Sequence, residues 1–289
     1  MQLLRKIETQ AFDKMQYLLG SSITRWPFSE LTTSAWRALV ARMPRRPGIM
    51  LAPERPAMAS GERPLELPPG GGLLTNVKDA GLLYFDELSQ AAHDVFRKSD
   101  FDRLVREKRG KTYEYKIDLL EVQPEPGTVF TKFAMQPRIL ELARSYLGVT
   151  PQYFAQCLWM DIPTEADPVD TQKWHRDPDD FKCLKVFVQL SEVTPETGPF
   201  CYVPVEHSRK LYGQFGKFRR FDHRHRVSDE EMREYVPEKD WVTVTGPVGT
   251  VAFVDTASCF HRGLKPRSGR RFMFQAVFTS AAPRVYWNR

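Results

Sequence analysis

Several patterns are missing from this sequence of 289 residues, and each absence excludes a class of protein. No stretch approaches the roughly 18 to 20 consecutive apolar residues of a membrane-spanning helix. The first ten residues carry charges where a secretory signal peptide has its apolar run. The four cysteines form no CxxC pair and lie among apolar residues, which favours reduced core thiols over a disulfide framework. We therefore expect a protein of the reducing cytoplasm with no membrane partner.

Clustered positive charge is also scarce. The 42 lysines and arginines exceed the 36 aspartates and glutamates, for a net charge of +6, but they are scattered along the chain. A surface that follows a nucleic-acid backbone needs clustered basic residues, so nucleic acid is not an expected partner. The mild positive balance is compatible with an anionic small-molecule substrate. The basic segment 219–226 is expected to be a solvated loop, and the alternative is a lid that pairs with such a substrate.

Proline and glycine divide the chain into two parts. They interrupt residues 44–72 so often that no regular element fits there, which predicts an extended connector. Two helices are expected before it, over residues 3–19 and from Ser29 onward, because apolar residues recur there at helical spacing. We therefore predict a helical N-terminal extension with its connector over residues 1–72 and one domain over residues 73–289.

The pattern of residue types changes near residue 150. Residues 73–150 are predicted to be mainly helical, with helices over residues 100–109 and from Gln136-Pro137 to Gly148. Beyond them, short runs rich in β-branched and aromatic residues alternate with turn residues, which is typical of strands. The predicted strands are residues 153–162, 183–190, 200–203, 241–245, 248–254, 259–264 and 271–279. This pattern predicts a mainly β fold with flanking helices, whose core over about residues 150–280 is a sandwich or a closed, barrel-like double sheet.

The segment Trp174-His175-Arg176-Asp177 and the distant His261 carry the clearest chemical signal. His175 and Asp177 are two positions apart, so on an extended segment their side chains face the same way. His261 follows Asp177 by 84 positions and must come from a neighbouring strand. Two imidazoles and one carboxylate cover one face of an octahedral metal ion and leave three positions open, which is typical of non-haem Fe(II). Taken singly, an HxD pair is more often a solvated loop, and one histidine is more often a hydrogen-bonded core residue.

The order of motifs around these residues resembles that of the phytanoyl-CoA dioxygenase family, within the Fe(II)/2-oxoglutarate oxygenases. The family's HxD motif matches His175 and Asp177, its distal histidine matches His261, and the resemblance covers about residues 73–280. The other matching elements are Leu190-Ser191-Glu192-Val193 with Gly198, the altered corner Pro204-Val205-Glu206-His207, the strand 249–253, and Gly269-Arg270-Arg271-Phe272.

The resemblance implies a fold, a metal and a cosubstrate. The fold would be a double-stranded β-helix, a jelly-roll or cupin-like core preceded by N-terminal helices. His175, Asp177 and His261 would bind Fe(II), 2-oxoglutarate would be the cosubstrate and O₂ the oxidant. An unactivated C–H bond of a small molecule would be hydroxylated or otherwise oxidised, with release of succinate and CO₂. Because Asp177 keeps the carboxylate that related halogenases replace by a small residue, halogenation is not expected.

The distal carboxylate of 2-oxoglutarate needs a planar, permanently charged donor with two prongs, which is arginine rather than lysine. Arg270 and Arg271 are adjacent, so on a strand they point to opposite faces and only one faces the interior. Arg271 is preferred because Met273 and Gln275 would share its face, and Arg270 is the alternative. Gln156, on the strand before the HxD motif, is a further candidate for the cofactor pocket.

Two further residues and two further functions complete the predictions. Trp174 is either a wall of the pocket or a structural plug, and His207 either fixes its loop or touches substrate. One alternative function is a catalytically silent family member that acts as a binding or regulatory protein. The other is a cupin-like zinc or manganese hydrolase or isomerase. The intact ligand set argues against the first, and the arginine after His261 argues against the second.

Overall fold

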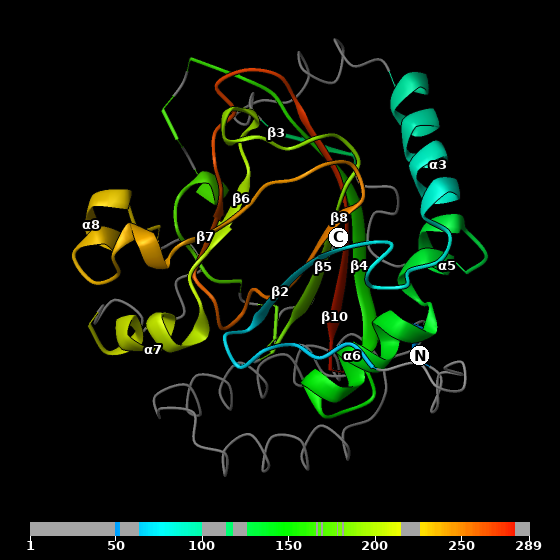
Figure 1. The fold of residues 1–289 in the computed structure, drawn as a ribbon, viewed down its shortest axis with the longest axis horizontal. Helices are drawn as coiled ribbons and strands as arrows, with labels where there is room; N and C mark the ends of the chain where they lie inside the picture. Colours follow the sequence, from blue (N-terminus) through cyan, green and yellow to red (C-terminus); the bar gives the residue numbers. More distant parts are fainter. Residues whose placement is uncertain are drawn as a thin grey trace, which may run out of the picture.

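The computed structural model describes residues 50–52, 64–99, 114–117, 126–165, 167–168, 170–177, 179–180, 182–214 and 226–280 (Figure 1). The helices predicted over residues 3–19, from Ser29 onward and over residues 100–109 lie outside them, as does most of the basic segment 219–226. No helix in the described part of the chain is long and apolar enough to cross a membrane.

Within the described residues, seven antiparallel strands form the larger of two sheets, in the order β1-β4-β10-β5-β8-β2, with β3 also paired to β4. These strands are β1 (Met50–Leu51), β2 (Gly72–Asn76), β3 (Glu114–Ile117), β4 (Gln152–Asp161), β5 (Leu184–Gln189), β8 (Thr250–Asp255) and β10 (Arg271–Thr279). The two longest, β4 and β10, pair from Arg271 opposite Asp161 to Thr279 opposite Gln152. Because β10 is buried along its whole length, its sequence is a nearly continuous apolar run rather than an alternating one.

Three short strands form the smaller sheet, in the order β7-β6-β9, with bounds β6 (Phe200–Tyr202), β7 (Val242–Val244) and β9 (His261–Gly263). Apolar side chains pack between the sheets, among them Phe187 of β5 and Phe200 of β6, whose ring centroids are 4.5 Å apart. The predicted sandwich is confirmed, whereas the alternative of a closed barrel is wrong for the described strands. The pairings of the described strands leave β1 and β2 at the edges of the larger sheet and β7 and β9 at the edges of the smaller one, with no ladder between the two sheets.

Helices cover the outer faces of both sheets (Figure 1). On the larger sheet lie α3 (Phe85–Lys98), α5 (Val129–Ala134) and α6 (Pro137–Leu147), whose apolar faces share one core cluster with β10. Beside the smaller sheet lie α7 (Val205–Gln214) and α8 (Asp229–Arg233). The short 3₁₀ turns are η1 (Asp170–Gln172), η2 (Pro195–Thr197) and η4 (Glu238–Asp240). The helix predicted up to Gly148 is confirmed as α6, with Pro137 in its first turn and Gly148 left-handed at φ 69°.

Two strands lie where the sequence predicts mainly helix. β2 pairs with β8 from Gly72 opposite Val254, and β3 pairs with β4 from Glu114 opposite Asp161. The predicted domain start at residue 73 therefore falls inside β2, and β1 lies within the predicted connector. β2 was missed because its first residue, Gly72, looks like part of a loop. In the structure, a Cβ on Gly72 would overlap the ring and hydroxyl of Tyr202, so glycine is what lets the two sheets approach here.

Candidate active site

His175, Asp177 and His261 meet at one point between the sheets. Each offers one ligand atom, and these atoms all lie within 4.8 Å of one another. The His261 Nε2 atom is 3.3 Å from Asp177 Oδ2, and the His175 Nε2 atom is 3.9 Å from Asp177 Oδ1. Backbone pairing brings the distant residues together, because the His175 N–H donates to the His261 carbonyl (3.0 Å) and the His261 N–H to the His175 carbonyl (2.8 Å).

Both imidazoles are held in the form that a metal ligand needs. His175 Nδ1 lies 2.8 Å from the Lys173 carbonyl, and His261 Nδ1 lies 3.1 Å from the Cys259 carbonyl. A carbonyl only accepts, so each Nδ1 carries a hydrogen, and Nε2 is the ring nitrogen that each histidine turns toward Asp177. Burial, together with the neighbouring His261, lowers the pKa of His175 to about 3, so this imidazole is neutral at pH 7. The donor set therefore fits a divalent first-row metal ion such as Fe(II).

Lys185 is a cation that the sequence analysis did not single out. It lies on β5 and is buried, with Nζ 2.6 Å from Asp177 Oδ2 and 3.4 Å from Asp179 Oδ2. Burial alone would raise the pKa of Asp177, but Lys185 and His261 outweigh it and hold that pKa well below its usual value. Burial would likewise lower the pKa of Lys185, whereas the two aspartates raise it above the ordinary range. The sequence signal for this residue was a single lysine within a predicted strand that is mostly apolar. Because lysine is rarely buried unless it is paired, a lysine at such a position indicates a carboxylate partner.

A cavity of about 550 Å³, counting the part that opens to solvent, lies at this point. The three candidate ligands and Lys185 lie on its wall together with apolar side chains, namely Trp159, Phe187, Phe200, Leu264 and Met273. Thr171, Gln172 and Gln275 add neutral polar groups. The cavity is thus partly apolar, with charged groups both at the candidate ligands and at Arg271 and Asp161.

Arg271 reaches this cavity, and Arg270 is exposed. The Arg271 Nε atom donates to Asp161 Oδ2 at 2.6 Å, and its Nη2 atom makes a second, closer contact with the same oxygen. Its Nη1 atom is buried and has no hydrogen-bond acceptor among the residues that the structure describes. A Cβ on Gly263 would lie 2.9 Å from Nη2, so glycine makes room for the guanidinium. One prong is thus held by Asp161, at the end of β4, and the other is available for a carboxylate.

The structure does not bring Gln156 to the cavity. Along β4 it alternates onto the face of Leu158 and Met160, which pack in the core beneath the helices. Its Oε1 atom accepts a hydrogen bond from the Tyr153 hydroxyl in this buried environment. A Gln156 contact with the cofactor has no geometric support.

The two predicted substrate contacts also lie off the cavity. Trp174 is fully buried on the far side of the His175 segment, and its Nε1 atom donates to Asp229 Oδ1 at 2.9 Å. This placement favours the structural plug over the pocket wall. His207, in the first turns of α7, has its Nε2 atom 3.9 Å from Asp240 Oδ2. This contact connects α7 with η4, so the placement favours the prediction that His207 fixes its part of the chain.

Comparison with known proteins agrees with this geometry. A search of curated proteins finds no match to the sequence. Among solved structures, the chain is similar to EctD from S. alaskensis with bound Fe, at 18% identity and a TM-score of 0.53 over 83% of this chain and 87% of that one. It is also similar to the non-haem α-ketoglutarate-dependent epimerase SnoN from nogalamycin biosynthesis, at 22% identity and a TM-score of 0.51 over 73% and 79% of the two chains. These likenesses confirm the predicted jelly-roll fold.

The family follows from a direct match. The model of the phytanoyl-CoA dioxygenase (PhyH) family matches residues 81–272, a span that includes all three candidate ligands and Arg271. The match covers most of the chain and confirms the predicted resemblance. This chain belongs to the phytanoyl-CoA dioxygenase family of oxidoreductases.

Proposed function

We propose that this protein is an Fe(II)- and 2-oxoglutarate-dependent oxygenase that oxidises an unactivated C–H bond of a small molecule. The observation that carries the proposal is the convergence of two imidazoles and one carboxylate on a cavity that also holds Arg271. A structural metal site is closed by four protein ligands, whereas three leave positions for reactants. Family membership supports the same chemistry.

His175, Asp177 and His261 would hold the metal, and Fe(II) with 2-oxoglutarate and O₂ would supply the oxidising power, releasing succinate and CO₂. Arg271 would bind the distal carboxylate of 2-oxoglutarate through its Nη1 atom, while Asp161 fixes the plane of the guanidinium. The backbone carbonyls of Lys173 and Cys259 hold both imidazoles so that each Nε2 would face the metal.

The residues that line the cavity limit which substrates can bind. Aromatic and aliphatic side chains surround the ligands, so they exclude water and favour a substrate that presents an apolar carbon to the metal. Lys185 already pairs with two aspartates, so Arg271 supplies the cationic group that is open to a ligand among the described lining residues. The outcome of the reaction depends on where the substrate carbon sits rather than on the fold, as the likeness to an epimerase illustrates.

The test is anaerobic reconstitution of the purified protein with Fe(II) and 2-oxoglutarate. We expect the visible charge-transfer band of an Fe(II)–2-oxoglutarate chelate, and succinate release after O₂ is admitted that depends on both additions. His175→Ala and His261→Ala should abolish both signals. A protein that binds Zn(II) or Mn(II) but shows neither signal with Fe(II) would support the hydrolase or isomerase alternative and overturn this proposal.

A further inference from the structure

A layer of side chains lies directly behind the candidate metal ligands, on the side away from the cavity. Trp174 precedes His175 and Arg262 follows His261, so strand alternation turns both of them to the opposite face. Both side chains are buried, Trp174 fully and Arg262 with 8% of its surface exposed. Whatever fixes Trp174 and Arg262 therefore also fixes the backbones that carry the two histidines.

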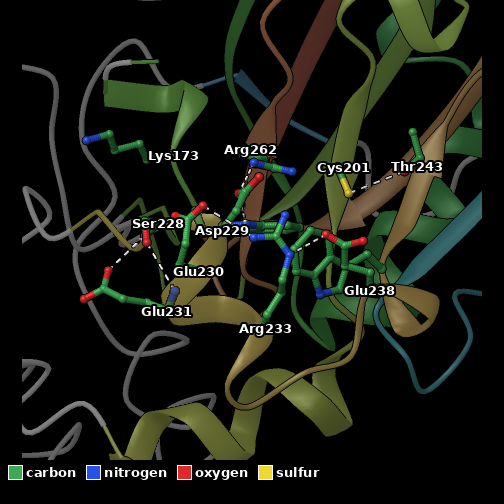
Figure 2. A network of polar contacts seen from close by, with 12 residues as sticks. Lys173, Cys201, Ser228, Asp229, Glu230, Glu231, Arg233, Glu238, Thr243 and Arg262 are labelled. Atoms are coloured by element: carbon green, nitrogen blue, oxygen red, sulfur yellow. Dashed lines mark hydrogen bonds and ion pairs between the residues drawn. The ribbon is translucent and has the colours of Figure 1, made fainter. Parts of the chain in front are cut away.

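Asp229 joins these two side chains. Its Oδ1 atom accepts a hydrogen bond from Trp174 Nε1 at 2.9 Å. The same atom also accepts from Arg262 Nη1 (Figure 2). The Arg262 guanidinium lies 4.5 Å from the centroid of the Trp174 ring and 5.4 Å from that of Trp241. An arginine removed from water needs such a carboxylate and aromatic faces, because an unpaired buried charge is strongly destabilising.

Asp229 belongs to a separate element, the first turn of α8. Ser228 caps this helix through a reciprocal pair of hydrogen bonds with Glu231. Just before the cap, Val227 pairs with Trp174, with backbone N–O distances of 3.0 and 2.9 Å. α8 is thus attached to the His175 segment by its backbone and to both histidine segments by one carboxylate oxygen.

We propose that Asp229 is a positioning residue for the metal centre and that it couples the order of α8 to metal binding. By holding Trp174 and Arg262 together, it sets the spacing of His175 and His261 without touching the metal itself. Coupling of this kind is reciprocal, so metal binding must stabilise α8 as much as α8 favours metal binding. The inference rests on the proposed function, because it takes His175 and His261 to be metal ligands.

The experiment compares Asp229→Asn with the wild-type protein. The asparagine keeps an oxygen that accepts from Trp174 and loses the charge that pairs with Arg262. We expect Fe(II) affinity, titrated anaerobically, to fall about tenfold, as for other residues that orient ligands from behind. Hydrogen exchange over residues 229–233 should slow when Fe(II) binds to the wild type and should slow much less in the variant. A residue with a packing role alone would change the melting temperature and leave these two signals intact.

The matched control is Glu230→Gln, which removes one charge from the next position of the same helix. The Glu230 side chain is 79% exposed and contacts only Arg233 among the ion pairs of the described residues, so metal affinity and exchange should stay at wild-type values. Trp174→Phe is the second variant, since it removes the donated hydrogen and keeps a buried ring. It should weaken Fe(II) binding in the same direction even if Asp229→Asn does not fold.

Two results would overturn the inference. If wild type binds Fe(II) and both variants bind it within about twofold of wild type, the Asp229 cluster only packs and does not position the ligands. If wild type binds no Fe(II) at all, the proposed function itself fails and the inference fails with it. The two failures are distinguishable because only the second is seen in the wild-type titration.

Discussion

At the scale of single residues, the site is arranged so that each buried charge has a partner. Asp177 is paired with Lys185, Arg271 with Asp161, and Arg262 with Asp229. Removing one member of such a pair leaves the other charged in a poorly solvated place, so a substitution has a stability effect as well as a functional one. A functional test at this scale therefore requires a variant that keeps the charge and changes only its geometry, whereas a stability test can remove the charge.

Arg271→Lys meets this requirement. The lysine keeps a positive charge beside Asp161 but loses the planar fork that serves two carboxylates at once. We expect the apparent dissociation constant for 2-oxoglutarate to rise roughly tenfold or more, as for the loss of a hydrogen bond to a charged group. Isothermal titration of the metal-loaded protein measures it.

Arg270→Lys is the matched control, because Arg270 is exposed and lies directly before the first residue of β10. It should leave 2-oxoglutarate binding unchanged. If Arg270→Lys rather than Arg271→Lys weakened binding, the assignment of the cosubstrate arginine would be wrong.

Lys185→Met tests whether the Lys185 ammonium and a bound metal ion both stabilise the charge of Asp177. The substitution leaves Asp177 and Asp179 without their ammonium, which should destabilise the metal-free protein by about 3–5 kcal/mol. A bound divalent cation then replaces the missing charge, so Mn(II) should raise the melting temperature of the variant more than that of wild type. Thermal unfolding with and without Mn(II) measures the difference. Equal metal-induced shifts in the two proteins would contradict a shared role of Lys185 and metal at Asp177.

At the scale of elements, hydrophobic pattern predicts what is long and buried. The predicted strand over residues 271–279 coincides with β10, and those over 153–162 and 183–190 differ from β4 and β5 by one residue at each end. β2 and β3 escape because each is short and owes its structure to a partner strand, β8 or β4, that is distant in the chain. The residues of a short strand do not by themselves show which distant strand will pair with it.

Gly72, at the start of β2, gives an element-scale prediction. A Cβ there would overlap Tyr202 of the smaller sheet, so Gly72→Ala should destabilise the fold by about 1–3 kcal/mol through overpacking. Gly70→Ala is the control, since a Cβ at that position meets its nearest atoms at an ordinary 3.6 Å. Urea unfolding of both variants measures the difference. Equal stabilities would mean that the sheets separate easily at this point.

At the scale of the whole molecule, the candidate site could be predicted only in part. The HxD motif and the distal histidine are recognisable from spacing and family likeness, and the structure brings them together. Asp161, Lys185 and Asp229 were not predicted, because each pairs with a residue on another element. Gln156 was predicted for the pocket but faces the core, because a strand covered on both sides gives no sequence signal of which face is which.

The same topology makes the metal a link between the two sheets. His175 and Asp177 lie on the segment that leads into β5 of the larger sheet, and His261 begins β9 of the smaller sheet. An ion held by all three restrains both layers, so binding should stabilise the whole domain by mass action. At a free metal concentration of 100 times the dissociation constant, the gain is about 2.7 kcal/mol. For a domain of this size that corresponds to a rise in melting temperature of about 5–10 °C, which a chelator should reverse.

His261→Ala should melt at the same temperature with and without metal, because two ligands on one segment no longer join the sheets. A metal-dependent rise that survives in His261→Ala would place the ion elsewhere in the protein.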